Sequence, residues 1–437
     1  MKRIIAQSSL QQHDFVVNRE IGLYSRKNGL VQNFYQKDLS NHFGCVNALN
    51  FSGNQDFFLS GGDDRSVLMW KTSEALLKKR PEAMKMDSEH ISNIFAVEFN
   101  CNGNIAYSGG NDCILFAHDC STGKLIRSYT ITCPVFDVDA HVNSSALLAS
   151  SEGNGSVEFF DVRDKSSESI LHIELSSRHE RVYTGRYNPA VPNQFLIASS
   201  RDLQVHDLRF LTRKDVYKGL LSTPLQNNVM FANWNSKGTG VIALEAGHYP
   251  IYYDLMEKNV VRLLDDCYSN YHTVKSADLI DDRYFVSGSD TFDLFIWDLE
   301  KKEEERGCQK ASSFKDYVVK SSDHKLEGHR SIVNNVCYSS FNDILISSGV
   351  EKIVKVWCPY AVLNSYKEPN KREIGSLAGF LRADSDEGED IETLLYFDSL
   401  LMDPGMDLFN EELNFDDDED SSDSNNVYKT NQAQEVS

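Results

Sequence analysis

Two Asp-x-Arg tripeptides contain the side chains whose types and spacing best suit a specific interaction. They are Asp161 with Arg163 and Asp207 with Arg209, and each follows a short apolar and aromatic run. Residues two apart on a β-strand project to the same side, so each Asp is expected to hold its Arg in place. A guanidinium held in this way offers a planar set of donors to carboxylates or carbonyls of a partner. The alternative is that each pair only braces the end of its own strand.

The sequence contains no motif of a catalytic or metal centre. Neither the phosphate-binding G-x-x-x-x-G-K-[ST] loop nor the G-x-S-x-G turn of hydrolases is present. His179 and Glu180 are not followed by the second His of a zinc-binding helix, and the 9 Cys and 12 His residues show no ligand spacing. We therefore expect a protein that is not an enzyme and that needs no cofactor or metal.

A second set of polar residues recurs at fixed spacing. In three segments that align without gaps, a His precedes an acidic residue by 22 positions, and a Ser precedes the end of the segment by ten. Polar side chains tolerate burial when their hydrogen bonds are satisfied, so this spacing predicts a structural network inside each repeat. Its members are His42, Ser60, Asp64 and Trp70; His90, Ser108 and Asp112; and His329, Ser347, Glu351 and Trp357.

These segments belong to a longer series of repeats. The end positions are residues 70, 118, 160, 206, 253, 297 and 357. Within each repeat, short runs of β-branched and aromatic residues alternate with Gly, Asn and Asp turns. Four short strands in about 45 residues are typical of a WD40 propeller blade. We expect an all-β fold, a seven-bladed WD40 propeller over residues 33–360 with an insertion at 301–323, closed by a strand at 33–39.

The two flanks differ from the repeats. Residues 1–32 are predicted to form a short N-terminal extension, either a disordered leader or a docking helix over 13–27. Residues 361–437 form an acidic tail that is predicted to be largely disordered by self-repulsion. The apolar segment 391–401 interrupts this tail. As a short helix it could bind a groove on a partner or pack back on the propeller.

Charge and cysteine usage restrict the partners. The chain has 437 residues and a net charge of −21, most of it in the tail, which argues against a binder of nucleic acid backbones. No apolar stretch resembles a signal peptide or a membrane span. The cysteines form no C-x-x-C pair, which indicates reduced thiols. We therefore expect a protein of the nucleus or the cytoplasm, or of both, without a nucleic acid or membrane partner.

The paired D-x-R motifs resemble the W-D-x-R boxes of WD40 substrate receptors of cullin-4 RING ubiquitin ligases. Stretches at 37–52, 59–70, 287–297 and 328–360 are similar to the family of factors associated with that ligase. The resemblance departs at Phe160 and His206, which replace the Trp of the box, and at Thr291, which replaces the turn Asp of the sixth repeat.

This resemblance implies a receptor with two faces. Asp161, Arg163, Asp207 and Arg209 would bind the damaged-DNA-binding-protein-one adaptor of the cullin-4 ligase, and the opposite face would present unidentified protein targets for ubiquitination. The alternative is a WD40 scaffold in another nuclear or cytoplasmic complex. The candidate target-binding residues are Asp63, Arg65, Asn111, Arg201, Asp290, Arg330 and Lys352.

Overall fold

The structure is a computed structural model, and it describes residues 34–88, 90–143, 146–151, 155–164, 169–174, 181–210, 222–224, 228–304 and 314–367. The predicted extension 1–32, the tail beyond residue 367 and its segment 391–401 lie outside the described residues. Within the described part, nearly all regular elements are β-strands. The exceptions are the helix α2 (Thr72–Leu77) and the 3-10 turns Leu208–Phe210 and Leu299–Lys301.

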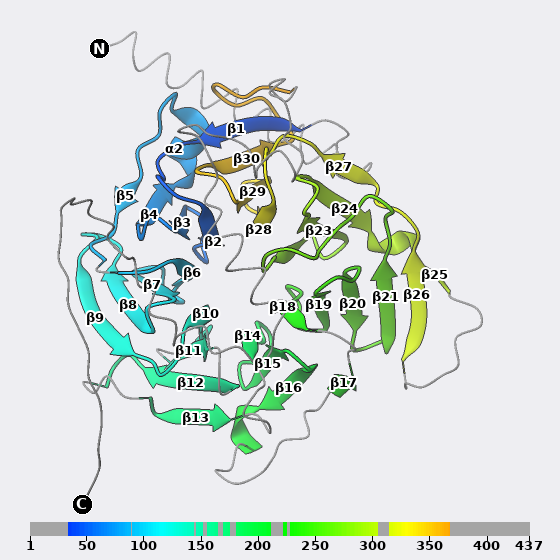
Figure 1. Cartoon of the computed structure of the whole chain (residues 1–437), viewed down its shortest axis with the longest axis horizontal. Helices are drawn as coiled ribbons and strands as arrows, with labels where there is room; N and C mark the ends of the chain where they lie inside the picture. Colours follow the sequence, from blue (N-terminus) through cyan, green and yellow to red (C-terminus); the bar gives the residue numbers. More distant parts are fainter. Residues whose placement is uncertain are drawn as a thin grey trace, which may run out of the picture. The chain divides into compact units, whose positions relative to one another are not determined.

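Five sheets have four antiparallel strands that neighbour one another in chain order (Figure 1). Their second and third strands are mostly short apolar runs, and several are buried along their whole length, such as Tyr284–Gly288 and Leu294–Asp298. The five sheets are β2 (Val46–Phe51), β3 (Phe57–Gly62), β4 (Val67–Lys71) and β5 (Met84–Lys85); β6 (Ile94–Phe99), β7 (Ile105–Gly110), β8 (Ile114–Asp119) and β9 (Leu125–Thr130); β10 (Val135–Ala140), β11 (Ala146–Ser151), β12 (Ser156–Asp161) and β13 (Leu171–Glu174); β14 (Val182–Tyr187), β15 (Gln194–Ser199), β16 (Asp202–Asp207) and β17 (Ser222–Pro224); and β22 (Ala277–Ile280), β23 (Tyr284–Gly288), β24 (Leu294–Asp298) and β27 (His324–Leu326).

A sixth four-stranded sheet joins the two ends of the repeat region. It consists of β1 (Tyr35–Leu39), β30 (Val354–Cys358), β29 (Ile344–Gly349) and β28 (Val333–Ser339). β1 pairs antiparallel with β30, from Tyr35 opposite Cys358 to Leu39 opposite Val354. The predicted closure by residues 33–39 is confirmed, and it removes a sheet edge that would otherwise be open.

One sheet departs from the four-strand form. β18 (Val229–Trp234), β19 (Gly240–Glu245), β20 (Ile251–Asp254) and β21 (Asn259–Leu263) make a regular set. β26 (Lys315–Val319) then adds to β21 in parallel, and β25 (Glu303–Glu304) adds to β26. The described parts of the predicted insertion 301–323 therefore enlarge the sheet that precedes them in the chain to six strands.

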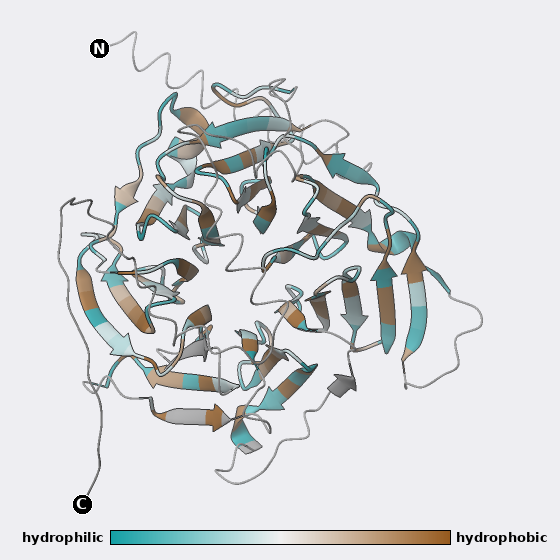
Figure 2. Ribbon diagram, in the orientation of Figure 1, coloured by the Kyte–Doolittle hydropathy of each residue, from teal (hydrophilic) through white to brown (hydrophobic). Residues whose placement is uncertain are grey.

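The sheets form a closed ring. Their first strands contact one another in the cycle β2, β6, β10, β14, β18, β22, β28 and back to β2. Hydrophobic clusters fill the space between neighbouring sheets, as where Phe58 and Trp70 meet Ile346 and Val356. Figure 2 shows hydrophobic residues concentrated in the strands and hydrophilic ones in the loops. The predicted all-β WD40 propeller is confirmed, with six regular four-stranded sheets and one enlarged sheet.

Strand direction gives the ring two faces. Because successive strands of a sheet are antiparallel, the loop before each first strand lies at the same end as the turn between the second and third strands. We call this end the His face, because it contains His42, His90 and His329. The other end receives the last residues of the third strands, such as Asp161 and Asp207, and we call it the D-x-R face.

Candidate protein-interaction sites

The two D-x-R motifs adopt the same geometry on neighbouring sheets. Asp161 ends β12 and Asp207 ends β16. The Arg163 Nε donates to Asp161 Oδ1 at 3.0 Å and its Nη2 to Oδ2 at 2.6 Å. The matching distances from Arg209 to Asp207 are 2.9 and 2.6 Å. The backbone N–H groups of both arginines also donate to their Asp, at 2.9 and 3.0 Å, so each Asp fixes its Arg from two sides.

Both guanidinium groups are exposed while their carboxylates are largely covered. The side chains of Arg163 and Arg209 are 75% and 60% exposed, against 22% and 9% for Asp161 and Asp207. Hydrogen bonds from Arg163 lower the pKa of Asp161 to about 2, and those from Arg209 lower the pKa of Asp207. The pairs therefore stay ionised at neutral pH, and both present a cation on the D-x-R face.

A third fork of the same kind was not predicted. The Arg283 Nε and Nη2 donate to Asp298 at 2.9 and 2.6 Å. Asp298 ends β24, as Asp161 ends β12, but its Arg comes from the turn between β22 and β23. The D-x-R spacing is therefore one of two routes to this geometry, and a search for the tripeptide alone misses the other.

The repeated His, Ser, acidic and Trp side chains are joined by hydrogen bonds. His42 contacts Asp64 through Nδ1 at 2.9 Å and Ser60 through Nε2 at 2.7 Å, and Trp70 donates to Ser60 at 2.9 Å. The same bonds join His329, Glu351, Ser347 and Trp357 at 2.6–3.2 Å, and His90, Asp112 and Ser108 at 2.8–2.9 Å. These contacts tie the loop before each first strand to its own sheet.

Glycine follows the network Ser because two backbones meet there. A Cβ on Gly62 would lie 2.0 Å from the Cys45 carbonyl oxygen, and one on Gly349 would lie 1.9 Å from that of Ile332. These distances are far below van der Waals contact, so the Ser-Gly and Gly-Gly pairs at the ends of second strands have a steric cause.

The sixth repeat builds this network from different residues. Asp290, not Thr291, holds the loop, accepting from the backbone N–H groups of Tyr271 and His272 at 2.6 and 3.2 Å and forming an ion pair with Lys275. Tyr268 contacts Ser287 at 3.2 Å, where other repeats use a His. The Asp290 side chain is only 6% exposed. Its carboxylate faces its own loop, and the predicted contact of Asp290 with a target remains a prediction.

The rings that replace Trp keep its packing role. Trp70 stacks on Phe58 with centroids 5.8 Å apart, and His206 stacks on Phe195 in the same way at 5.1 Å. Phe160 is fully buried and packs against Tyr129 at 5.0 Å. Burial lowers the pKa of His206 to about 4, so this ring is neutral at physiological pH.

The other candidate target-binding residues lie on the His face. The side chains of Asp63 and Asn111 are hydrogen-bonded there, Asp63 to Asn47 at 2.5 Å and Asn111 to Ser92 at 3.4 Å. The basic residues Arg65, Arg201, Arg330 and Lys352 are exposed.

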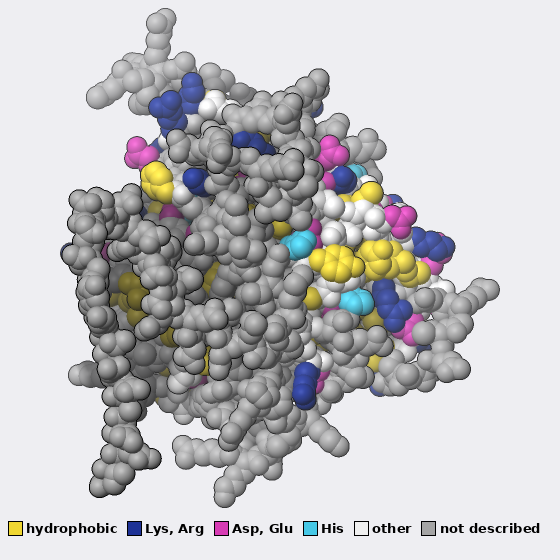
Figure 3. All heavy atoms as spheres, viewed as in Figure 1, with side chains coloured by type: hydrophobic (Ala, Val, Ile, Leu, Met, Phe, Trp, Pro, Cys, Tyr) yellow, Lys and Arg dark blue, Asp and Glu magenta, His cyan; other side chains and the backbone are white. Residues whose placement is uncertain are grey.

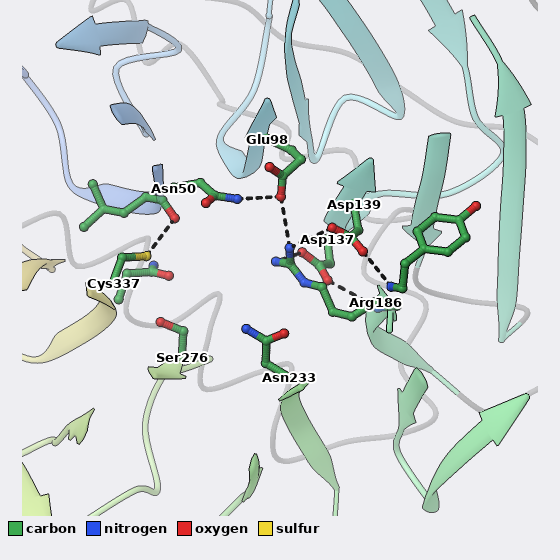
Figure 4. Close-up of polar contacts among 12 residues, drawn as sticks. Asn50, Glu98, Asp137, Asp139, Arg186, Asn233, Ser276 and Cys337 are labelled. Carbon is green, nitrogen blue, oxygen red and sulfur yellow. Dashed lines mark hydrogen bonds and ion pairs between the residues drawn. The ribbon is translucent and has the colours of Figure 1, made fainter. Parts of the chain in front are cut away.

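A buried cluster of charges in the centre of the ring was missed by sequence reasoning. Glu98, Asp139 and Arg186 are each the fifth residue of one of three neighbouring first strands (Figure 4). Asp137 lies two residues before Asp139 on β10 and therefore points to the same side of the strand. Arg186 contacts Asp137 at 2.6 Å, Glu98 at 3.1 Å and Asp139 at 3.5 Å. Asn50 also donates to Glu98, at 2.5 Å.

Burial changes the protonation of this cluster. It raises the pKa of Glu98 to about 8, with the charge of Asp139 adding to the effect, and raises the pKa of Asp137 to about 7. Arg186 opposes both shifts. The cluster joins the second, third and fourth sheets through Arg186 and three carboxyl groups, of which Glu98 and Asp137 are partly protonated near neutral pH.

A cavity of about 290 Å³ adjoins the cluster. Arg186, Asn50, Asn233, Asp278 and Cys337 line it, together with residues of the β2–β3 turn on the D-x-R face. No group of three or more potential ligands that could hold a metal ion occurs among the residues with described positions. Likewise, no helix in that part of the chain is long and apolar enough to span a membrane.

Comparisons with known proteins agree with the WD40 propeller fold. The family model "WD domain, G-beta repeat" matches residues 34–71 and 320–358. The chain is 33% identical over 338 residues to "DDB1- and CUL4-associated factor 5" of Mus musculus and of Homo sapiens, an alignment that covers 75% of this chain and 34% of each relative. It is 28% identical over 218 residues to "WD repeat protein iqw1" of Schizosaccharomyces pombe, which covers 44% of this chain and 26% of that protein.

The chain spans about a third of the length of the two associated factors that it matches. The aligned region is nevertheless long enough to hold a whole ring of sheets. WD40 repeats are matched at both ends of that ring, and the chain is similar to DDB1- and CUL4-associated factor 5.

Proposed function

We propose that this protein is a non-catalytic substrate receptor of a ubiquitin ligase containing DDB1 and CUL4. The D-x-R face binds the adaptor DDB1, and the His face takes the protein targets. In this proposal, the six-stranded sheet that contains β18–β21 and β25–β26 is one of seven blades of the ring. The receptor works in the nucleus, the cytoplasm or both.

One observation carries this proposal beyond similarity. Arg163 and Arg209 project from equivalent strand ends of adjacent sheets, each locked by two hydrogen bonds to a covered Asp. A fixed guanidinium loses less side-chain entropy on binding than a mobile one, and its planar shape suits carbonyls or carboxylates of a partner. A pair that served only to brace its strand would not need its Arg side chain 75% or 60% exposed.

Such a receptor acts through proximity. When one face holds the adaptor and the other holds a target, target lysines are kept at high effective concentration near the ubiquitin-charged enzyme. No side chain of the receptor has to transfer a proton or form a covalent bond.

The test is charge reversal at both arginines in the full chain. We expect Arg163→Glu with Arg209→Glu to reduce recovery of DDB1 and CUL4 in affinity purification at least tenfold. Thermal stability should stay within a degree or two, because exposed ion pairs contribute little to it. A matched variant, Arg65→Glu with Arg330→Glu, reverses two exposed arginines of the His face and should retain both proteins. Undiminished recovery by the Arg163/Arg209 variant would exclude this adaptor site.

A further inference from the structure

The hydrogen-bonded network determines which side chains project from the His face. Four consecutive sheets of the ring, those that begin with β22, β28, β2 and β6, share one backbone contact. The N–H of the residue after the His donates to the acidic residue of the network, and in the sixth repeat, Asn270 takes the place of the His. Phe43 donates to Asp64 at 3.0 Å and Ile91 to Asp112 at 3.1 Å. Tyr271 and Arg330 donate to Asp290 and Glu351, both at 2.6 Å. The backbone is fixed at each of these four positions, and the side chain is directed outward.

Three of these four side chains are large and apolar, and all three are exposed. Phe43 is 85% exposed, Ile91 72% and Tyr271 64%. Exposed apolar residues are common singly, but here three occupy equivalent positions within four consecutive blades of one face, with Arg330 at the fourth position. In Figure 3, hydrophobic, His, basic and acidic side chains lie close together on one side of the molecule.

The charges beside these residues are sorted by sign. The four carboxylates of the network are turned inward, with 0–10% of each side chain exposed. Basic side chains of the same turns, Arg65, Arg330 and Lys352, are exposed. The exposed acids Asp87, Asp266 and Glu327 lie farther out, next to the fourth strands, and Asp63, in the turn that contains Arg65, is half-buried. We call Phe43, Ile91, Tyr271, Arg65, Arg330 and Lys352 the apolar–basic surface. Its chemistry fits a partner that is both apolar and acidic.

The chain itself contains a segment of that chemistry. Residues 384–401, DSDEGEDIETLLYFDSLL, combine seven acidic residues with an apolar run and contain no Lys or Arg. We propose that this segment binds the apolar–basic surface of its own chain and occupies the face that would otherwise receive a partner. This inference does not depend on adaptor binding, because it concerns the opposite face.

The tether is long enough for this contact. The last described residue, Lys367, follows Tyr366, which is bridged to Gln36 on the outermost strand of its sheet. From there to the innermost strand of the sheet is three strand spacings, about 14 Å. The 16 residues between 367 and 384 span roughly 22 Å as a flexible chain. A tether of this length gives a local concentration in the millimolar range, so even weak contacts would be occupied.

Photocrosslinking in the full chain tests the proposal. A benzophenone amino acid replaces Phe397, and cross-linked peptides are identified by mass spectrometry after irradiation of the monomer. We expect intramolecular cross-links to the loops around residues 42–44, 90–92, 270–272 and 329–331. Raising the salt concentration from 0.05 to 0.5 M should reduce their yield at least threefold, because the contact is partly ionic.

Two variants separate this surface from a general apolar attraction. Phe43→Ser with Ile91→Ser and Tyr271→Ser should reduce the cross-links at least fivefold. Met256→Ser removes a side chain that is 75% exposed in the β20–β21 turn of the D-x-R face, and it should leave them unchanged. Melting curves of the variants should match wild type, because all four side chains are exposed. Cross-links to the D-x-R face, cross-links between chains only, or no cross-links would each overturn the proposal. Loss of adaptor binding in the Arg163/Arg209 variant would not alter these results, so the two proposals fail separately.

Discussion

Removing the central cation should destabilise the ring in a way that depends strongly on pH. The Arg186 side chain is 18% exposed and contacts carboxylates of two neighbouring sheets. In Arg186→Met these carboxylates remain buried without a counter-charge. Breaking a buried ion pair from one side costs about 3–5 kcal/mol, and we expect this loss of unfolding free energy at pH 8.5.

The loss should shrink in mild acid. Glu98 and Asp137 have raised pKa values, about 8 and 7, so at pH 5.5 both hold protons in the folded state. A carboxyl whose folded pKa lies above its unfolded value stabilises the fold below the unfolded pKa, and this contribution is lost as pH rises through the folded pKa. Removing Arg186 raises these folded pKa values further. The destabilisation at pH 5.5 should therefore be no more than roughly half of that at pH 8.5.

Urea unfolding of wild type and variant at pH 5.5, 7.0 and 8.5 measures this difference. Wild type should itself lose stability between pH 7 and 8.5. Burial lowers the pKa values of His118 and His206 to about 4. These two histidines therefore reduce the stability of the fold as the pH falls below about 6.5, which is opposite to the effect of Glu98 and Asp137. Glu98→Gln in the Arg186→Met background should recover stability at pH 8.5, and Arg186→Lys should behave more like wild type. A loss below about 1 kcal/mol, or one that is the same at all three pH values, would refute the assigned charge balance.

Two further predictions concern closure and the repeat network. Ser60→Ala should lower the unfolding free energy by about 2–5 kcal/mol, since His42 and Trp70 both lose a buried partner, and chemical denaturation will measure it. A cost below 1 kcal/mol would mean that the network adds little. Leu39→Ala should cost a similar 2–5 kcal/mol, because Leu39 on β1 is 1% exposed in the cluster between the closing sheet and the first. If this variant melts like wild type, β1 does not hold the ring closed.

The repeats could be predicted because their spacing is local. His42, Ser60, Asp64 and Trp70 all lie within 29 residues, and the same steps recur near residue 329. Each step follows from the length of a strand plus a tight turn, so the sequence pattern directly reflects one sheet. The pairing of 33–39 with the last repeat followed from the need to close the ring.

The central cluster could not be predicted in this way because its members come from separate blades. Arg186 lies 49 residues from Asp137 and 88 from Glu98. The signal lies in position within the repeat, since Glu98, Asp139 and Arg186 are each fifth in a first strand. An alignment of the first strands would have found it, whereas a search for motifs does not.

Register and sheet extension account for the remaining differences. Fixed spacing places the acidic residue of the sixth repeat at position 291, which is Thr291. The acidic residue that binds the loop is Asp290, one position earlier, and the turn accommodates this shift. β25 and β26 lie in a charged segment whose pattern resembles no blade strand. Their pairing depends on the open edge of β21, which the sequence of the segment itself does not reveal.

Carboxylates carry out related tasks on the two faces of the ring. On the D-x-R face, Asp161 binds the guanidinium and the backbone N–H of Arg163, which fixes an exposed cation. On the His face, Asp64 binds the backbone N–H of Phe43, which fixes an exposed ring. In both cases the acid is covered and the group that it positions meets the solvent. If both faces bind partners, loss of the acid should weaken binding even though the contacting side chain is still present. Asp161→Ala should then reduce adaptor recovery with Arg163 intact, whereas a site that depended on net positive charge would bind more tightly.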